Sequence, residues 1–226
     1  MHAFGVPAQW VGGAWERGES YDCSRSLQVF ILHPSSSIPP LMKALDRLLQ
    51  SWRIAKIRPF LASGARVLDI GCADGALLRQ APAVGEYIGI DPAIDRTLYT
   101  DGGTLIKGTF PDDLPDKRAF DAITMLAVLE HIPAAAQAPL ADACRRFLRP
   151  GGLALITVPS PWVDSVLAVL KFLRVIDGMS LEEHYGFDVR QVPACFAAPA
   201  FQLVAHRRFQ LGLNNLFVFR RTEERS

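Results

Sequence analysis

The sequence predicts an α/β fold: a doubly wound, mostly parallel sheet that ends with an antiparallel strand from a C-terminal hairpin. Three observations support this prediction. Short β-rich runs alternate with helical runs, an amphipathic helix precedes the first of them, and two final β-rich runs are separated only by a turn. With 226 residues, the chain can form one such domain and a short appendage.

The first predicted element is an amphipathic helix from Pro40 to Leu61. Apolar residues recur at helical spacing with Lys and Arg between them: Leu41, Leu45, Leu48, Leu49, Trp52, Ile57 and Phe60. Residues 1–38 are rich in Gly, Ser and Pro. We therefore expect an irregular N-terminal extension over 1–38 and one domain over 39–226.

Seven strands are predicted from β-rich runs. Five belong to the parallel sheet and two to the hairpin: 66–70, 86–90, 104–107, 120–125, 152–158, 201–209 and 215–221. The last two are joined by a tight turn that contains Gly212, Asn214 and Asn215. A hairpin there makes the final strand antiparallel.

Composition narrows the function classes. Lys plus Arg (24) nearly balances Asp plus Glu (23), so nucleic acid is not the default partner. The four cysteines are scattered and are expected to be reduced thiols, not a metal site or a disulfide frame. We find neither a signal peptide pattern nor an apolar run of membrane-span length, so the expected compartment is the cytoplasm.

The run from Arg66 to Ala76 reads as a buried strand, a small-residue turn and a helix start, which suits a nucleoside cofactor. A dinucleotide fingerprint would need glycine where Ala73 stands, because a methyl group blocks the approach of a pyrophosphate. Asp69 and Asp74 flank the turn, and their charge favours the ammonium and sulfonium of S-adenosylmethionine. Asp91 ends the second strand, where a carboxylate can accept hydrogen bonds from ribose hydroxyls of either cofactor.

These motifs resemble the class I methyltransferases, particularly the broad group that includes quinone-biosynthesis and small-molecule enzymes. The segments that carry the resemblance are Val67–Gly75, Gly89–Asp91, Phe120–Ile123, Leu129–Ile132 and Leu148–Gly152. It implies a Rossmann-like fold and S-adenosylmethionine as the cofactor. The implied cofactor-binding residues are Asp69, Gly71, Cys72, Ala73, Asp74, Gly75, Asp91, Pro92, Thr109, Phe110, Met125 and Leu126.

Within this set, the resemblance assigns the methionine part to the turn, the ribose to Asp91, the adenine to Gly108–Phe110 and the reactive side to Met125–Ala127. The chain departs from the family pattern at Ala73, which is often glycine. It departs again at Thr109, where many relatives carry an acidic residue near the adenine amine.

Methyl transfer requires an aligned acceptor and benefits from a base that removes its proton. The candidates are His131, just after the fourth strand, and His184, between the fifth and sixth strands. A packing role for His131 and a solvated loop position for His184 are the plainer interpretations.

The segment 159–190 is expected to be a variable insertion on the substrate side. Its apolar run from Trp162 to Ile176 favours a small-molecule acceptor with an apolar part, such as a lipid-linked or aromatic compound, and a glycan is a further possibility. Two alternatives stay open: an NAD-dependent oxidoreductase, and a non-catalytic interaction protein with the same fold.

Overall fold

The computed structural model describes residues 40–81, 83–160, 187–197 and 199–223. The predicted extension over 1–38, the apolar run from Trp162 to Ile176 and His184 lie outside the described residues. Within the described residues, no helix is long and apolar enough to cross a membrane.

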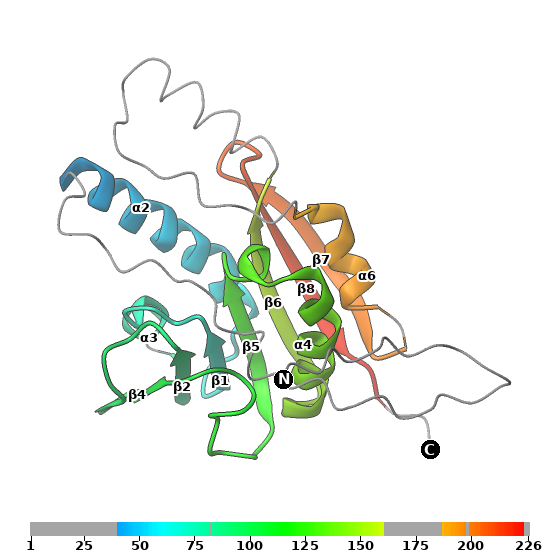
Figure 1. Ribbon diagram of the computed structural model, residues 1–226, viewed down its shortest axis with the longest axis horizontal. Helices are drawn as coiled ribbons and strands as arrows, with labels where there is room; N and C mark the ends of the chain where they lie inside the picture. Colours follow the sequence, from blue (N-terminus) through cyan, green and yellow to red (C-terminus); the bar gives the residue numbers. More distant parts are fainter. Residues whose placement is uncertain (1–39, 82, 161–186, 198, 224–226) are drawn as a thin grey trace, which may run out of the picture.

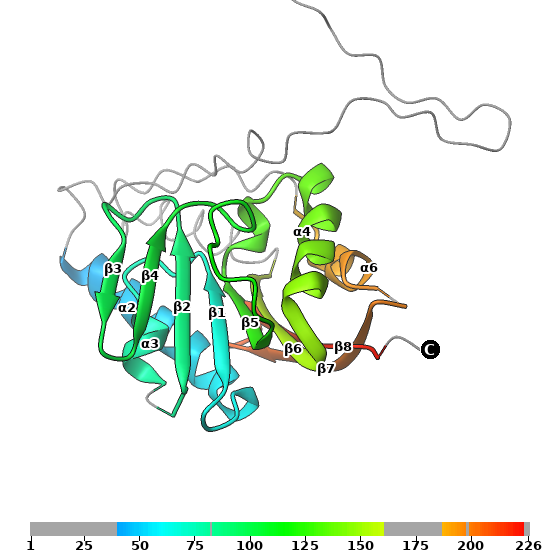
Figure 2. The same cartoon turned by 90° about the horizontal axis from the view of Figure 1, so that it is seen from below.

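One eight-stranded sheet forms the centre of the molecule, in the order β3-β4-β2-β1-β5-β6-β8-β7 (Figures 1 and 2). Neighbours from β4 to β6 are parallel, whereas β3, β8 and β7 join antiparallel. The strands are β1 Arg66–Ile70, β2 Glu86–Asp91, β3 Leu98–Thr100, β4 Gly103–Lys107, β5 Phe120–Leu126, β6 Leu148–Pro159, β7 Phe201–Phe209 and β8 Asn214–Arg221. The predicted parallel sheet with an antiparallel hairpin is confirmed.

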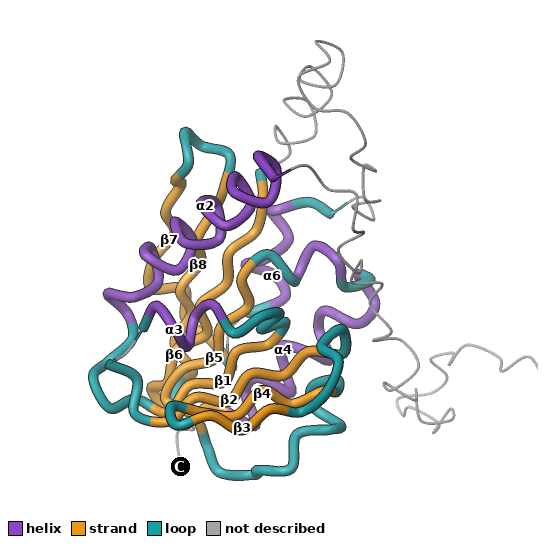
Figure 3. Tube along the Cα trace, turned by 90° about the vertical axis from the view of Figure 1, so that its left-hand side faces the viewer, coloured by secondary structure: helices purple, strands orange, loops and turns teal. Residues whose placement is uncertain are grey.

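Helices cover both faces of the sheet (Figures 2 and 3). Helices α2 and α3 pack on one face, and α4 and α6 pack on the other. The helical elements are α2 Pro40–Ile57, η1 Arg58–Phe60, α3 Ala76–Gln80, η2 Leu129–His131, α4 Ala134–Phe147, η3 Val189–Gln191 and α6 Val192–Cys195. Alternation along β1 directs Leu68 into the α4-side core and Val67 into the α2-side core, so this strand is buried on both faces.

The parallel strands end at one edge of the sheet, which we call the carboxyl edge. It is formed by the segments that follow β1, β2, β4, β5 and β6. Because β8 runs antiparallel to β6 and pairs Asn214 with Pro159, the turn between β7 and β8 lies at this edge too. Open α/β sheets bind ligands at such an edge, where successive connections diverge to opposite faces.

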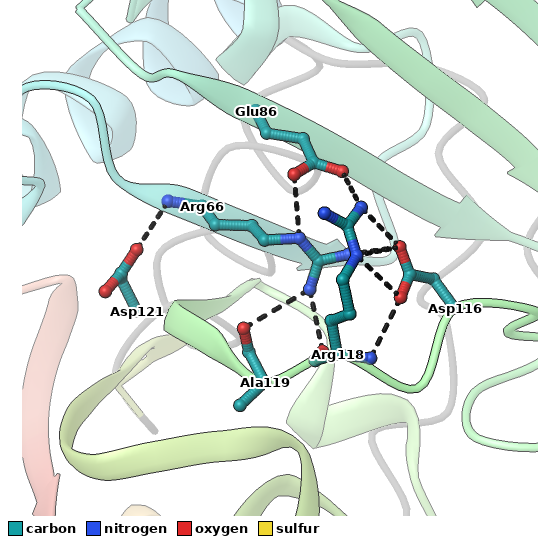
Figure 4. A network of polar contacts seen from close by, with 6 residues as sticks. All are labelled: Arg66, Glu86, Asp116, Arg118, Ala119 and Asp121. Carbon is teal, nitrogen blue, oxygen red and sulfur yellow. Dashed lines mark hydrogen bonds and ion pairs between the residues drawn. The ribbon is translucent and has the colours of Figure 1, made fainter.

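The opposite, amino edge is held by charges (Figure 4). The Arg66 guanidinium at the start of β1 donates to Glu86 (2.9 Å) and to Asp116 (2.5 Å). Arg118 donates to the same two carboxylates at 2.7 Å each. Arg66 also lies 4.0 Å from the centre of the Phe120 ring. This network joins β1, β2 and the segment before β5.

Three details differ from the sequence prediction. Strand β3 was missed because its residues are all exposed and it exists only through pairing with β4. Asn214 and Asn215 begin β8 and do not lie in the turn, which is formed by left-handed Gln210, Leu211 and Gly212. Strand β6 begins at Leu148, and its pairing with β5 is interrupted before Leu153.

Candidate functional site

The turn after β1 is built from left-handed backbone. Gly71, Ala73 and Gly75 have φ of 72°, 44° and 72°. Space as well as conformation requires glycine at Gly71, because a Cβ there would overlap the Val128 side chain. Ala73 takes the left-handed conformation despite a cost of roughly 1–2 kcal/mol for a residue with a Cβ. The turn therefore lies directly against the segment that follows β5.

Asp91 is linked to this turn by hydrogen bonds. Its carboxylate is 1% exposed and accepts from the Ala73 N–H and the Ala93 N–H, both at 2.8 Å. Each oxygen receives one of these bonds, so each keeps acceptor capacity for a ribose hydroxyl. Gly89 permits the close approach of the turn to β2, since a Cβ there would lie 2.7 Å from the Cys72 side chain.

Asp69 lies beneath the turn with its carboxylate buried. Tyr87 donates its hydroxyl to Oδ2 at 2.7 Å, and Thr124 donates to Oδ1 at 2.5 Å. Burial raises the pKa of Asp69 to about 6, and the two hydroxyls oppose that rise. Sequence reasoning missed both partners. The signal was available, since a carboxylate inside a buried strand needs donors from neighbouring strands.

The other predicted turn residues occupy contrasting environments. Asp74 is exposed and forms an ion pair with Arg79 at 2.5 Å. Cys72 is buried, and burial raises the pKa of its thiol above the ordinary range. The Cys72 side chain packs in the α2-side core. Pro92 is half-buried and directly follows the Asp91 carboxylate.

The segment after β4 carries the predicted adenine contacts. Thr109 donates its N–H and its hydroxyl to Asp113 Oδ2, at 2.7 and 3.0 Å. The Phe110 ring is buried in the α4-side core, where it meets Phe147 edge to face at 5.3 Å. The backbone of Phe110, and not its ring, is therefore left to flank an adenine. Asp113 is a further acidic candidate that the sequence reasoning missed.

The segment after β5 completes the edge. Met125 is fully buried on the α4 side, whereas Leu126 is half-buried and packs with the α2-side core. Ala127 is left-handed (φ 59°) and donates its N–H to the Thr157 carbonyl at 2.9 Å. His131 ends η2 with a half-buried side chain, and its N–H donates to the Val128 carbonyl at 3.0 Å.

These residues fit S-adenosylmethionine better than a dinucleotide. Asp69 and Asp91 place two buried carboxylates at the turn, where they favour a cationic ligand. A pyrophosphate would instead meet this negative charge and the Ala73 methyl group. The structure thus brings Asp69, the Gly71–Gly75 turn, Asp91 and Thr109 to one edge together with His131.

Comparisons with known proteins agree with this geometry. A family model described as a methyltransferase domain matches residues 41–208. The ubiquinone biosynthesis O-methyltransferase of Nitrobacter winogradskyi is 29% identical over 154 residues, covering 61% of this chain and 58% of that protein. The protein of the same name from Xylella fastidiosa is 34% identical over 119 residues, covering 48% of each. The chain therefore spans less than two thirds of the length of these relatives.

Solved structures share the fold at low sequence identity. The magnesium protoporphyrin IX methyltransferase of Synechocystis PCC 6803 has a TM-score of 0.54 at 13% identity, covering 83% of this chain and 90% of that one. The 1,6-didemethyltoxoflavin-N1-methyltransferase of Burkholderia thailandensis also has a TM-score of 0.54, at 14% identity, with coverages of 84% and 93%. Both of those structures contain bound S-adenosylhomocysteine. Because the family model covers most of the described residues, the chain belongs to the class I S-adenosylmethionine-dependent methyltransferases.

Proposed function

We propose that this chain methylates a hydroxyl oxygen of a small-molecule acceptor that has an apolar part, and that it does so in the cytoplasm. The observation that carries the proposal is the joining of the left-handed turn to the buried Asp91 carboxylate through the Ala73 N–H. The names of the curated relatives favour oxygen as the methylated atom. The reduced thiols expected from the sequence favour the cytoplasm.

Different residues at the carboxyl edge bind different parts of the cofactor. Asp91 holds the ribose, and the turn from Gly71 to Gly75 surrounds the methionine part. Asp69 supplies negative charge beneath the turn. Thr109 and Asp113 lie on the adenine side, where Asp113 supplies a carboxylate next to Thr109.

When bound, the cofactor supplies a sulfonium-activated methyl group. The chain's own residues must hold the acceptor oxygen in line with that group and exclude water. The acceptor hydroxyl also loses its proton, and we assign the removal of that proton to His131, at the end of η2. His184 stays a second candidate outside the described residues.

The first test is calorimetric titration of the protein with S-adenosylmethionine, S-adenosylhomocysteine and NAD. We expect the first two ligands to bind and NAD not to bind. Asp91→Asn should weaken both sulfur ligands at least about tenfold, because it removes charge-assisted hydrogen bonds to the ribose.

Asp95→Asn is the matched control, since Asp95 is an exposed carboxylate in the segment after the same strand. It should leave both affinities unchanged. Binding of NAD in place of the sulfur ligands would support an oxidoreductase instead. Cofactor binding without methyl transfer to any hydroxylated acceptor would support an interaction protein.

A further inference from the structure

Four polar side chains gather at the carboxyl edge on the α2 side of the sheet. Arg53 comes from α2, Glu130 from η2, Gln210 from the turn between β7 and β8, and Asn214 from the start of β8. Glu130, Gln210 and Asn214 are each at most 4% exposed. We call these four residues the edge cluster. Burying a polar side chain costs free energy unless it has hydrogen-bond partners. The burial of several polar side chains at one place therefore needs an explanation.

Hydrogen bonds connect the β7–β8 turn to α2. The Asn214 amide donates to Gln210 Oε1, and Gln210 Nε2 donates to the Leu49 carbonyl at 3.0 Å. In an α-helix the Leu49 carbonyl also accepts from the N–H of Arg53, four residues later. Gln210 therefore lies beside the helical turn that carries Arg53. Asn214 shares this face, because Leu216 and Val218 of the same strand pack in the α2-side core.

Electrostatics relate Arg53 to η2. Burial lowers the pKa of Arg53, and the negative charges of Glu130 and Asp46 oppose that effect. η2 follows Val128, whose side chain lies against Gly71 of the cofactor turn. The edge cluster is therefore next to the cofactor turn, on the side reached through η2.

Unmatched polar atoms remain in the cluster. Within the described residues they include Arg53 Nε, a buried donor without an acceptor, and Asn214 Oδ1, a buried acceptor without a donor. These unmatched atoms are complementary in kind. A hydroxyl group satisfies both at once, since its oxygen accepts a hydrogen bond while its O–H donates another.

We propose that the edge cluster is a subsite for a hydroxyl group of the methyl acceptor, with Arg53 donating to the hydroxyl oxygen and Asn214 accepting from it. The subsite deepens the proposed function and rests on it. Its specificity follows from the two unmatched atoms, because an acceptor without the hydroxyl leaves a buried donor and a buried acceptor unpaired. A methyl ether at the same place can accept from Arg53 but cannot donate to Asn214.

The test measures binding of 4-propylphenol and 4-propylanisole to the complex with S-adenosylhomocysteine, by ligand-observed NMR. These probes share the apolar part and differ only in the hydroxyl proton and one methyl group. We expect the wild type to bind the phenol at least about tenfold more tightly. Arg53→Met and Asn214→Leu should each remove that preference and change the affinity for S-adenosylhomocysteine less than twofold.

Arg47→Met is the control, since Arg47 is an exposed arginine on the same helix, and it should keep the preference. The subsite is disproved if the wild type binds both probes equally, binds neither, or keeps the preference in both cluster variants. Unchanged binding of S-adenosylhomocysteine shows that a variant is folded. If Arg53→Met does not fold, Asn214→Leu by itself tests the subsite. Failure of the wild type to bind S-adenosylhomocysteine would refute the proposed function, and the subsite with it.

Discussion

At the scale of single residues, Asp69 shows how binding and stability oppose each other. Its carboxylate is buried and receives hydrogen bonds from two neutral hydroxyls, those of Tyr87 and Thr124. The negative charge of Asp91 also raises the pKa of Asp69. The negative charge at the turn therefore lowers the folding stability of the unliganded protein, and a bound cationic ligand offsets this loss.

Without ligand, Asp69→Asn should be more stable relative to wild type at pH 8 than at pH 5. The folded pKa of Asp69 is about 6, above the ordinary value of 3.8, so the native state binds this proton more tightly than the unfolded state. Wild-type stability from this group is fully present below pH 4 and falls as the pH rises through 6. Urea denaturation at both pH values should show the difference between variant and wild type growing by about 1–3 kcal/mol.

The same variant should bind S-adenosylmethionine more weakly, because the charge beneath the turn is gone. Asp95→Asn is the comparison, since Asp95 is an exposed carboxylate outside the turn. A stability difference between Asp69→Asn and wild type that does not change with pH would show that the native pKa of Asp69 is not raised, so that Asp69 is already ionised at pH 5 in both the native and the unfolded state.

At the scale of elements, the turn after β1 and the segment after β5 fit together at Gly71. Gly71→Ala should destabilise the protein more than Gly64→Ala does. Both glycines are left-handed, with φ of 72° and 74°, so both variants bear the same conformational cost. A Cβ at Gly64 meets nothing within 4 Å, whereas one at Gly71 overlaps Val128. The excess should be about 1–3 kcal/mol by chemical denaturation.

Val128→Ala combined with Gly71→Ala isolates the contact. If crowding is the cause, the double variant should be more stable than the sum of the two single changes predicts. Additive effects would instead place the cost of Gly71→Ala in the backbone alone. The Gly71 variant should also bind S-adenosylhomocysteine more weakly than Gly64→Ala, because only Gly71 lies in the turn that we propose holds the cofactor.

Elements were predictable from the sequence where burial requires a local pattern of apolar residues. Strand β1 was predicted over its observed range, and β2 differs by one residue, because apolar runs in a parallel sheet are continuous. Strand β3 left no such pattern, since its residues are exposed. The start of β6 was hidden by Arg149-Pro150-Gly151, which has the composition of a turn but stays in the strand.

The site was predictable in its motif and not in its cross-strand partners. The turn and Asp91 were predicted as a cofactor site from their spacing, from the charges that flank the turn and from the resemblance to class I methyltransferases. The hydroxyls that hold Asp69 come from two different strands, and their approach depends on strand register, which the sequence does not display. The electrostatic influence of Glu130 on Arg53 depends on how α2 lies across the sheet, so it was equally hidden.

At the scale of the whole molecule, the two edges of the sheet have different chemistry. The amino edge is held by the Arg66 network, and Arg118 lowers the pKa of Asp116 to about 2, mainly through its side-chain hydrogen bond (Figure 4). Because this pKa lies below the unfolded value, the stabilisation is present above pH 4 and is lost as the pH falls toward 2.

Asp116→Asn should therefore reduce stability at pH 6, and its deficit relative to wild type should shrink as the pH falls from 4 to 2. Urea denaturation across that range measures the deficit. Arg118→Gln should reproduce the same pH dependence, since it removes the first cause of the lowered pKa. A deficit that stays constant down to pH 2 would contradict an ionised, paired Asp116.

The carboxyl edge, by contrast, is shaped for a ligand, and the contrast is testable by hydrogen exchange. Adding S-adenosylhomocysteine should slow amide exchange in 71–76, 91–93, 108–113 and 126–131, because ligand binding lowers the population of locally opened states at that edge. Exchange in 61–65 and 116–119, at the amino edge, should change little, because those segments open locally without disturbing the ligand. Slowing that is equal at both edges would mean that exchange proceeds through global unfolding, and slowing confined to the amino edge would place the cofactor at the wrong end of the sheet.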